Sequence, residues 1–97
     1  MPLYVVLYNW TEKGIANIKD SPARADMAVK AAQAAGGKIL GLWYTKGAYD
    51  VVAVAEWPDE KAATAFVLTQ AAQGFVRTTS LPALTRQEFA EIVKMIP

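Results

Sequence analysis

The chain contains neither cysteine nor histidine among its 97 residues. Without cysteine it has no disulfide, no thiolate nucleophile and no thiolate metal site. Without histidine it has no Ser-His-Asp triad, no ordinary zinc site and no proximal ligand for a haem iron. These two absences exclude most hydrolase and metalloenzyme mechanisms, and we expect the protein to use neither a metal nor a cofactor.

An excess of charge and long apolar runs are also lacking. Ten basic and nine acidic residues give a net charge of +1, which offers no electrostatic footprint for a phosphate backbone. No apolar run approaches the ~18 residues that span a bilayer. The opening MPLYVVLYNW lacks the basic region and cleavage site of a signal peptide. We therefore expect a soluble, cytoplasmic protein that binds neither nucleic acid nor membrane.

What the chain has is enough apolar material for one folded domain. An apolar content of 54% with 20% charged residues excludes disorder. A chain of this length holds a single core, so we predict one domain over residues 1–97.

The clearest local pattern runs from Lys38 to Trp57. Two short runs rich in β-branched and aromatic residues flank Lys46-Gly47-Ala48, where glycine can adopt the positive φ of a tight reversal. This pattern predicts two strands joined as a hairpin.

Apolar periodicity, caps and chain breakers predict six further elements. An alanine stripe on the first long helix should let that helix lie close on a sheet, and an apolar stripe on the last helix should dock it on the body. In chain order the elements are a strand at 3–10, a turn of helix capped by Thr11, a helix from Asp20 or Ser21 to Ala35, a helix from Asp59 to about Gln73, a strand at 75–81 that ends at Pro82, and a helix behind the capping box Thr85-Arg86-Gln87-Glu88.

Leaving out the short turn of helix after Thr11, the order is β-α-β-β-α-β-α, which predicts an α+β, ferredoxin-like fold. Its four-stranded antiparallel sheet carries two helices on one face, with the first and third strands at the centre. The other face needs a partner or the last helix to cover it. We infer a homo-oligomer, most simply a two-fold dimer. That face should carry some of the aromatic residues Tyr4, Tyr8, Trp10, Trp43, Tyr44 and Trp57, depending on the register.

Three blocks of the sequence together resemble the GYD domain family of small bacterial and archaeal proteins. The resemblance covers nearly the whole chain and implies a dimeric α/β-barrel type of fold, but no activity. The blocks are the opening YVVLYNWTEKGIANIKDSPARA, the motif Gly47-Ala48-Tyr49-Asp50 leading into VVAVAE, and the ending FVRTTSLPALTRQEFAEI.

The candidate site residues have two interpretations. Tyr49 and Asp50, just after the hairpin turn, either pack and bond locally or stand at the mouth of a pocket as acid and base. Arg77 is either an anion clamp or an edge-strand charge that prevents aggregation. Asn9 and Trp43 complete the candidate ligand site. Together with Trp10 and Tyr44, they also invite comparison with cofactor-independent monooxygenases of this general fold.

Three functional hypotheses follow. The first is a binding or assembly module, a small oligomer that holds an apolar or amphipathic metabolite without turnover, in a cleft by the sheet and between its subunits. The second is a cofactor-independent enzyme that uses Tyr49 and Asp50 with Arg77. The third is that the aromatic face only joins subunits. The lack of histidine and cysteine favours the first hypothesis.

Overall fold

The computed structural model describes residues 1–97. Its elements follow the predicted order, with one extra turn of 3-10 helix before the first long helix. They are β1 (Leu3–Trp10), α1 (Glu12–Ala16), η1 (Ile18–Asp20), α2 (Ser21–Ala34), β2 (Lys38–Tyr44), β3 (Val51–Glu56), α3 (Glu60–Ala72), β4 (Val76–Ala83) and α4 (Arg86–Val93).

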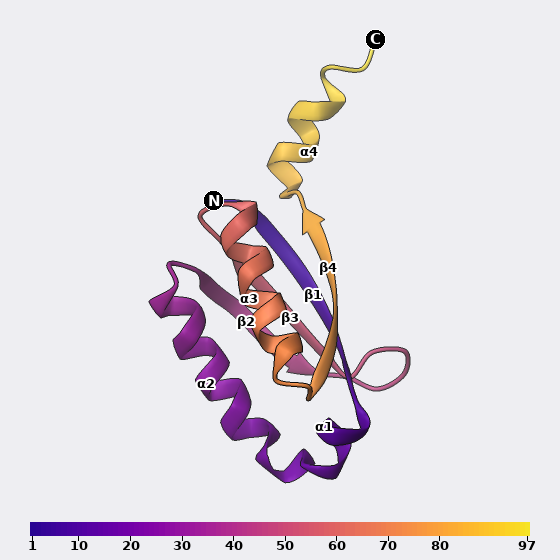
Figure 1. Ribbon diagram of the computed structural model, residues 1–97. Helices are drawn as coiled ribbons and strands as arrows, with labels where there is room; N and C mark the ends of the chain where they lie inside the picture. Colours follow the sequence, from indigo (N-terminus) through magenta and orange to yellow (C-terminus); the bar gives the residue numbers. More distant parts are fainter.

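The four strands form one antiparallel sheet in the order β2-β3-β1-β4. The prediction that the first and third strands are central is therefore confirmed. Helices α2 and α3 lie on the same face of this sheet (Figure 1). The arrangement is α+β and consistent with the expected ferredoxin-like fold.

Local interactions explain where the helices begin and end. The Thr11 hydroxyl accepts the Gly14 N–H in front of α1, and the Asp59 carboxylate accepts the Ala62 N–H at 2.8 Å in front of α3. These are side-chain caps for N–H groups that have no partner within the helix. Behind α2, Gly36 adopts a φ of 87°, and the Gly37 N–H donates to the Ala32 carbonyl at 2.8 Å, as in a Schellman turn.

The prediction that Pro82 ends the fourth strand is wrong. Strand β4 continues to Ala83, and Pro82 lies opposite Tyr4 of β1. Proline is tolerated here because β4 is an edge strand, so the missing N–H group faces no neighbouring strand.

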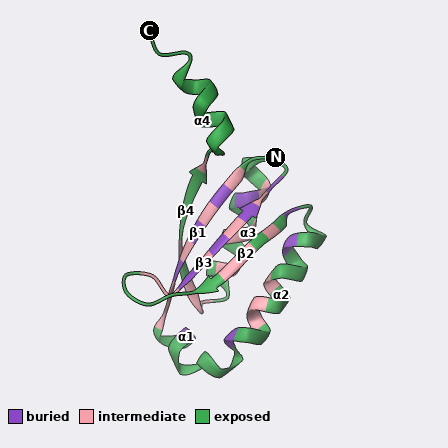
Figure 2. Cartoon of the chain, turned by 180° about the vertical axis from the view of Figure 1, so that it is seen from behind, coloured by how far each residue is buried: buried purple, intermediate pink, exposed green.

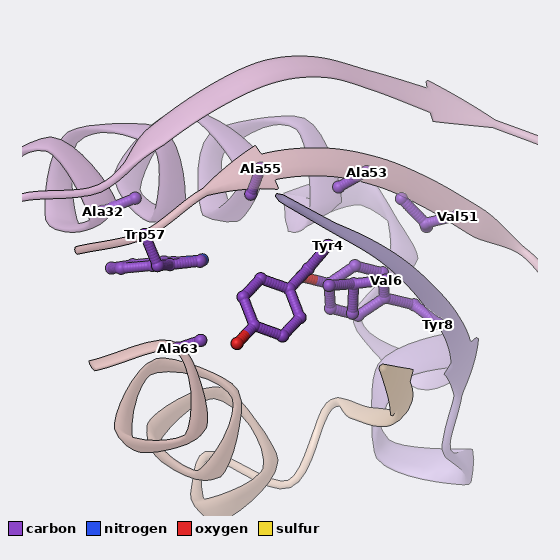
Figure 3. Close-up of a cluster of buried hydrophobic side chains, with 9 residues drawn as sticks. All are labelled: Tyr4, Val6, Tyr8, Ala32, Val51, Ala53, Ala55, Trp57 and Ala63. Atoms are coloured by element: carbon purple, nitrogen blue, oxygen red, sulfur yellow. The ribbon is translucent and has the colours of Figure 1, made fainter. Parts of the chain in front are cut away.

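The core lies between the sheet and its two helices. Figure 3 shows the rings of Tyr4, Tyr8 and Trp57 in this layer. Trp57 is only 1% exposed, and its ring lies 4.8 Å from that of Phe66. Position 37 has to be glycine beside it, because a Cβ there would stand 2.6 Å from the indole. The nine buried residues of the core are Tyr4, Val6, Tyr8, Ala32, Val51, Ala53, Ala55, Trp57 and Ala63.

The opposite side of the sheet, which we call the open face, is covered by no helix (Figure 2). The register places Val5, Leu7, Val52 and Val54 at its centre, all half-buried. Of the six aromatic residues named as candidates for this face, Trp43 alone lies on it. Trp43 is 56% exposed.

The prediction that the last helix docks on the body is wrong. Helix α4 stands away from the sheet and continues in the direction of β4 (Figure 1). The reason is that β4 reaches the end of the sheet at Ala83, opposite Leu3, so α4 begins beyond the body. The predicted capping box of Thr85 and Glu88 is confirmed.

The apolar stripe of α4 is consequently exposed. Phe89 is 59% exposed, and Ile96, just beyond the helix, is 66% exposed. Neither α4 nor any other helix of the chain is long and apolar enough to cross a membrane.

Candidate functional site

An apolar cleft lies between α2, α3 and the helix-covered face of the sheet. Its volume is about 540 Å³, within the range of small-molecule sites. Helix α2 packs mainly on β2 and α3 on β4, and the two helices hardly contact each other. The cleft is the space that their divergence leaves open.

The alanine stripe of α2 forms one wall of this cleft. The prediction that the stripe brings the helix onto the sheet is confirmed at Ala32, which is fully buried. Towards the start of the helix, Ala25 and Ala28 line the cleft instead. Their short side chains do not fill the space between the helix and the sheet. The opposite wall includes Ala65 and Phe66 of α3.

A buried phenol forms part of the cleft floor. The Tyr8 hydroxyl on β1 donates a hydrogen bond of 2.9 Å to Gln70 Oε1 on α3. Burial raises the pKa of Tyr8, and the bond to Gln70 only partly offsets that effect. The phenol therefore stays protonated at neutral pH and offers the cleft a neutral polar group.

Arg24 of α2 is the only charged residue that lines the cleft. Its guanidinium carbon lies 4.1 Å from the centre of the Phe75 ring, a cation–π contact. Nη1 donates to the Asn17 carbonyl at 3.1 Å. Nη2 is buried and has no hydrogen-bond partner. The guanidinium therefore has hydrogen-bonding capacity that the fold does not use.

A second cation shares the Phe75 ring with Arg24. Lys13 Nζ lies 4.4 Å from the ring centre and donates to the Gln73 carbonyl at 2.9 Å. The cleft thus has a positively charged end, while no acidic residue lines it.

Two of the site residues predicted from sequence meet at the base of the hairpin loop. Asp50 Oδ2 accepts the Trp10 N–H at 2.9 Å, and the Asp50 N–H donates to the Tyr8 carbonyl at 2.8 Å. Asn9 Nδ2 donates to the Ala48 carbonyl at 2.8 Å. These contacts fasten the loop to the end of β1.

The other three predicted residues lie around the same loop and on the open face. The Tyr49 carbonyl accepts a hydrogen bond from the Thr45 hydroxyl at 2.6 Å. Arg77 is exposed, opposite Asn9 in the sheet. Trp43 covers Gly41, where a Cβ would overlap the indole ring. None of the five predicted residues lines the cleft.

Neither this cleft nor Arg24 was predicted from the sequence. One signal was present: Arg24 stands four residues before Ala28, so it shares a helix face with the alanine stripe. An arginine at that position would have pointed to a charged group at the edge of an apolar surface. Two residues named for the monooxygenase comparison do line the cleft, Trp10 and Tyr44, whose rings stack at 6.4 Å.

Comparison with protein families gives one match. The GYD domain matches residues 4–93, nearly the whole chain. Searches among curated proteins and among solved structures found no match.

Proposed function

The chain belongs to the GYD domain family, and we propose that it is a binding module whose ligand is a small apolar or amphipathic metabolite. The observation that carries this proposal is the cleft between α2, α3 and the sheet. Of its 20 lining residues, 15 are hydrophobic. Water molecules inside the cleft therefore find few hydrogen-bond partners. A ligand with an apolar body would remove that surface from water, at roughly 25 cal/mol per Å² buried.

The binding role is preferred over the enzymatic one because of where the acid and base candidates lie. The Asp50 carboxylate already accepts the Trp10 N–H, and it stands outside the cleft together with Tyr49. A general base must reach the proton that it abstracts. The contacts of Asp50 favour a role in holding the hairpin loop.

We also propose that the module assembles as a two-fold dimer through its open face. Support comes from the apolar centre of that face, formed by Val5, Leu7, Val52 and Val54, and from the exposed Trp43. A two-fold axis would bring the same residues of both copies together. The ligand clefts would then lie on the outer, helix-covered sides of the dimer.

Native mass spectrometry of protein purified from cells without denaturation tests the binding role. Ala28→Trp fills the cleft from α2, whereas Ala23→Trp puts the same ring on an exposed position of that helix. We expect a bound small molecule with the unmodified chain and with Ala23→Trp, but not with Ala28→Trp. A bound mass retained by all three proteins, or found with none of them, would contradict the proposal.

Sedimentation velocity at micromolar concentration tests the assembly. Val54→Lys places a charge at the centre of the open face, and Val29→Lys places one on α2, on the helix-covered side. We expect a dimer for the unmodified chain and for Val29→Lys, and a folded monomer for Val54→Lys. A monomeric unmodified chain would rule out the dimer and leave the binding role standing.

A further inference from the structure

We infer that the ligand of the cleft is an amphipathic anion, a carboxylate or sulfonate on an apolar body, and that Arg24 selects it. This inference rests on the proposed binding function and narrows it to one class of molecule. None of the sequence patterns described above predicts a role for Arg24.

The charge of the cleft is the first observation. Among the 20 lining residues, Arg24 alone carries a charge, and the polar remainder consists of Ser21, Thr69, Gln70 and Gln73. A cationic ligand would therefore meet one like charge and no carboxylate. An anionic head group would meet one opposite charge in surroundings of low polarity, where ion pairing is stronger than in water.

The unused bonding capacity of Arg24 is the second observation. Leaving a guanidinium N–H buried without a partner costs free energy, and this is the state of Nη2. A carboxylate or sulfonate accepts two parallel N–H bonds from a guanidinium. Such a head group would satisfy Nη2 together with a neighbouring donor of the same side chain.

The third observation is that the guanidinium of Arg24 shares the Phe75 ring with a second cation, Lys13. Nη2 is enclosed where it stands, so binding a ligand would require the guanidinium to turn away from Phe75 into the cleft and to give up the bond of Nη1 to the Asn17 carbonyl. Lys13 Nζ lies 4.4 Å from the centre of the Phe75 ring and would keep its own cation–π contact with that ring. Two cations against one ring repel each other. When Arg24 leaves the ring, the relief of this repulsion offsets part of the cation–π energy that is lost.

Two fluorescent probes that differ in one group test the inference. Anilinonaphthalene sulfonate carries an anionic head, and phenylnaphthylamine has the same rings without it. We expect Arg24→Gln to weaken binding of the sulfonate by about tenfold or more, the worth of a charge-assisted hydrogen bond. Binding of the neutral probe should stay within about twofold, since it has no head group for Arg24.

Three variants complete the experiment. Arg77→Gln makes the same exchange on the open face and should leave both affinities unchanged. Arg24→Lys keeps the charge and, if Arg24→Gln folds poorly, replaces it as the test. It should retain a preference for the sulfonate but bind it more weakly than the unmodified chain, because lysine lacks the two-pronged geometry. Ala28→Trp should abolish binding of both probes.

The results that would contradict the inference distinguish the role of Arg24 from the binding function of the cleft. Equal effects of Arg24→Gln on both probes, or no effect on either, would overturn the role of Arg24 while leaving the cleft as the site. Full binding of both probes to Ala28→Trp, or no binding to the unmodified chain, would overturn the proposed function and this inference with it.

Discussion

Tyr8 Oη on β1 and Gln70 Oε1 on α3 lie 2.9 Å apart in a hydrogen bond across the floor of the cleft. The bond ties one wall of the cleft to a central strand. It also joins residues that stand 62 positions apart in the chain, so it forms only when the whole domain is folded.

The first prediction concerns Tyr8→Phe and pH. Loss of the hydroxyl should lower the free energy of unfolding by about 1 kcal/mol at neutral pH. Burial raises the pKa of Tyr8 above its ordinary 10.0, so the unfolded chain releases this proton at a lower pH than the folded one. The contribution of Tyr8 is therefore fully present below about pH 10 and is lost as the pH rises further.

Urea denaturation of both proteins between about pH 8 and about pH 11 provides the measurement. The stability advantage of the unmodified chain should shrink at the alkaline end. A constant difference across the range would mean that the ionisation of Tyr8 is not coupled to folding.

The second prediction concerns Asp50. Asp50→Ala leaves the partly buried Trp10 N–H without its acceptor and should destabilise the fold by about 1–3 kcal/mol. Asp50→Asn keeps an acceptor oxygen and should cost less. Asp26→Ala removes an exposed carboxylate of α2 and serves as the control in the same urea titration. If Asp50→Ala is as stable as Asp26→Ala, the bond to Trp10 does not hold the loop.

The third prediction concerns Gly41 and Trp43 on the open face. A Cβ at position 41 would overlap the indole, so Gly41→Ala should push the ring away from the sheet. Acrylamide quenching of tryptophan fluorescence should then increase. The same exchange in a Trp43→Phe background should have no effect on quenching. An effect that persists in that background would place the change at Trp10 or Trp57 instead.

The fourth prediction concerns α4. Because the apolar stripe of α4 is exposed, a chain that ends at Leu84 should keep the thermal midpoint of the full chain within a few degrees. Circular dichroism and thermal unfolding check this outcome at a concentration where both chains are monomeric. A large drop in the midpoint would show that α4 packs on the body in solution.

Much of the fold could be predicted because it depends on neighbours in the chain. Caps such as Thr11 and the pair Thr85 and Glu88 act within three residues, and the positive φ of Gly47 is a property of its own backbone. Such interactions are visible in a short stretch of sequence. The order of these elements then sufficed to predict the sheet topology.

The candidate site could not be predicted in the same way. Asp50 has a recognisable place after a turn, but its acceptor role depends on Trp10, 40 positions away. The cleft depends on the angle at which α2 leaves the sheet. Ala32 of α2 belongs to the same core cluster as Trp57 of the segment after β3, and no local pattern specifies how the rest of the helix is placed relative to the sheet.

The sequence by itself determined the elements, their caps and the central place of β1 and β3, because hydrophobic period and turn chemistry act over a few residues. Only the tertiary structure decided which face of each strand is buried, since a shift of one residue in register exchanges the two faces. It likewise decided that α4 begins beyond the sheet and that Arg24 meets Phe75, because both depend on where distant segments come to lie.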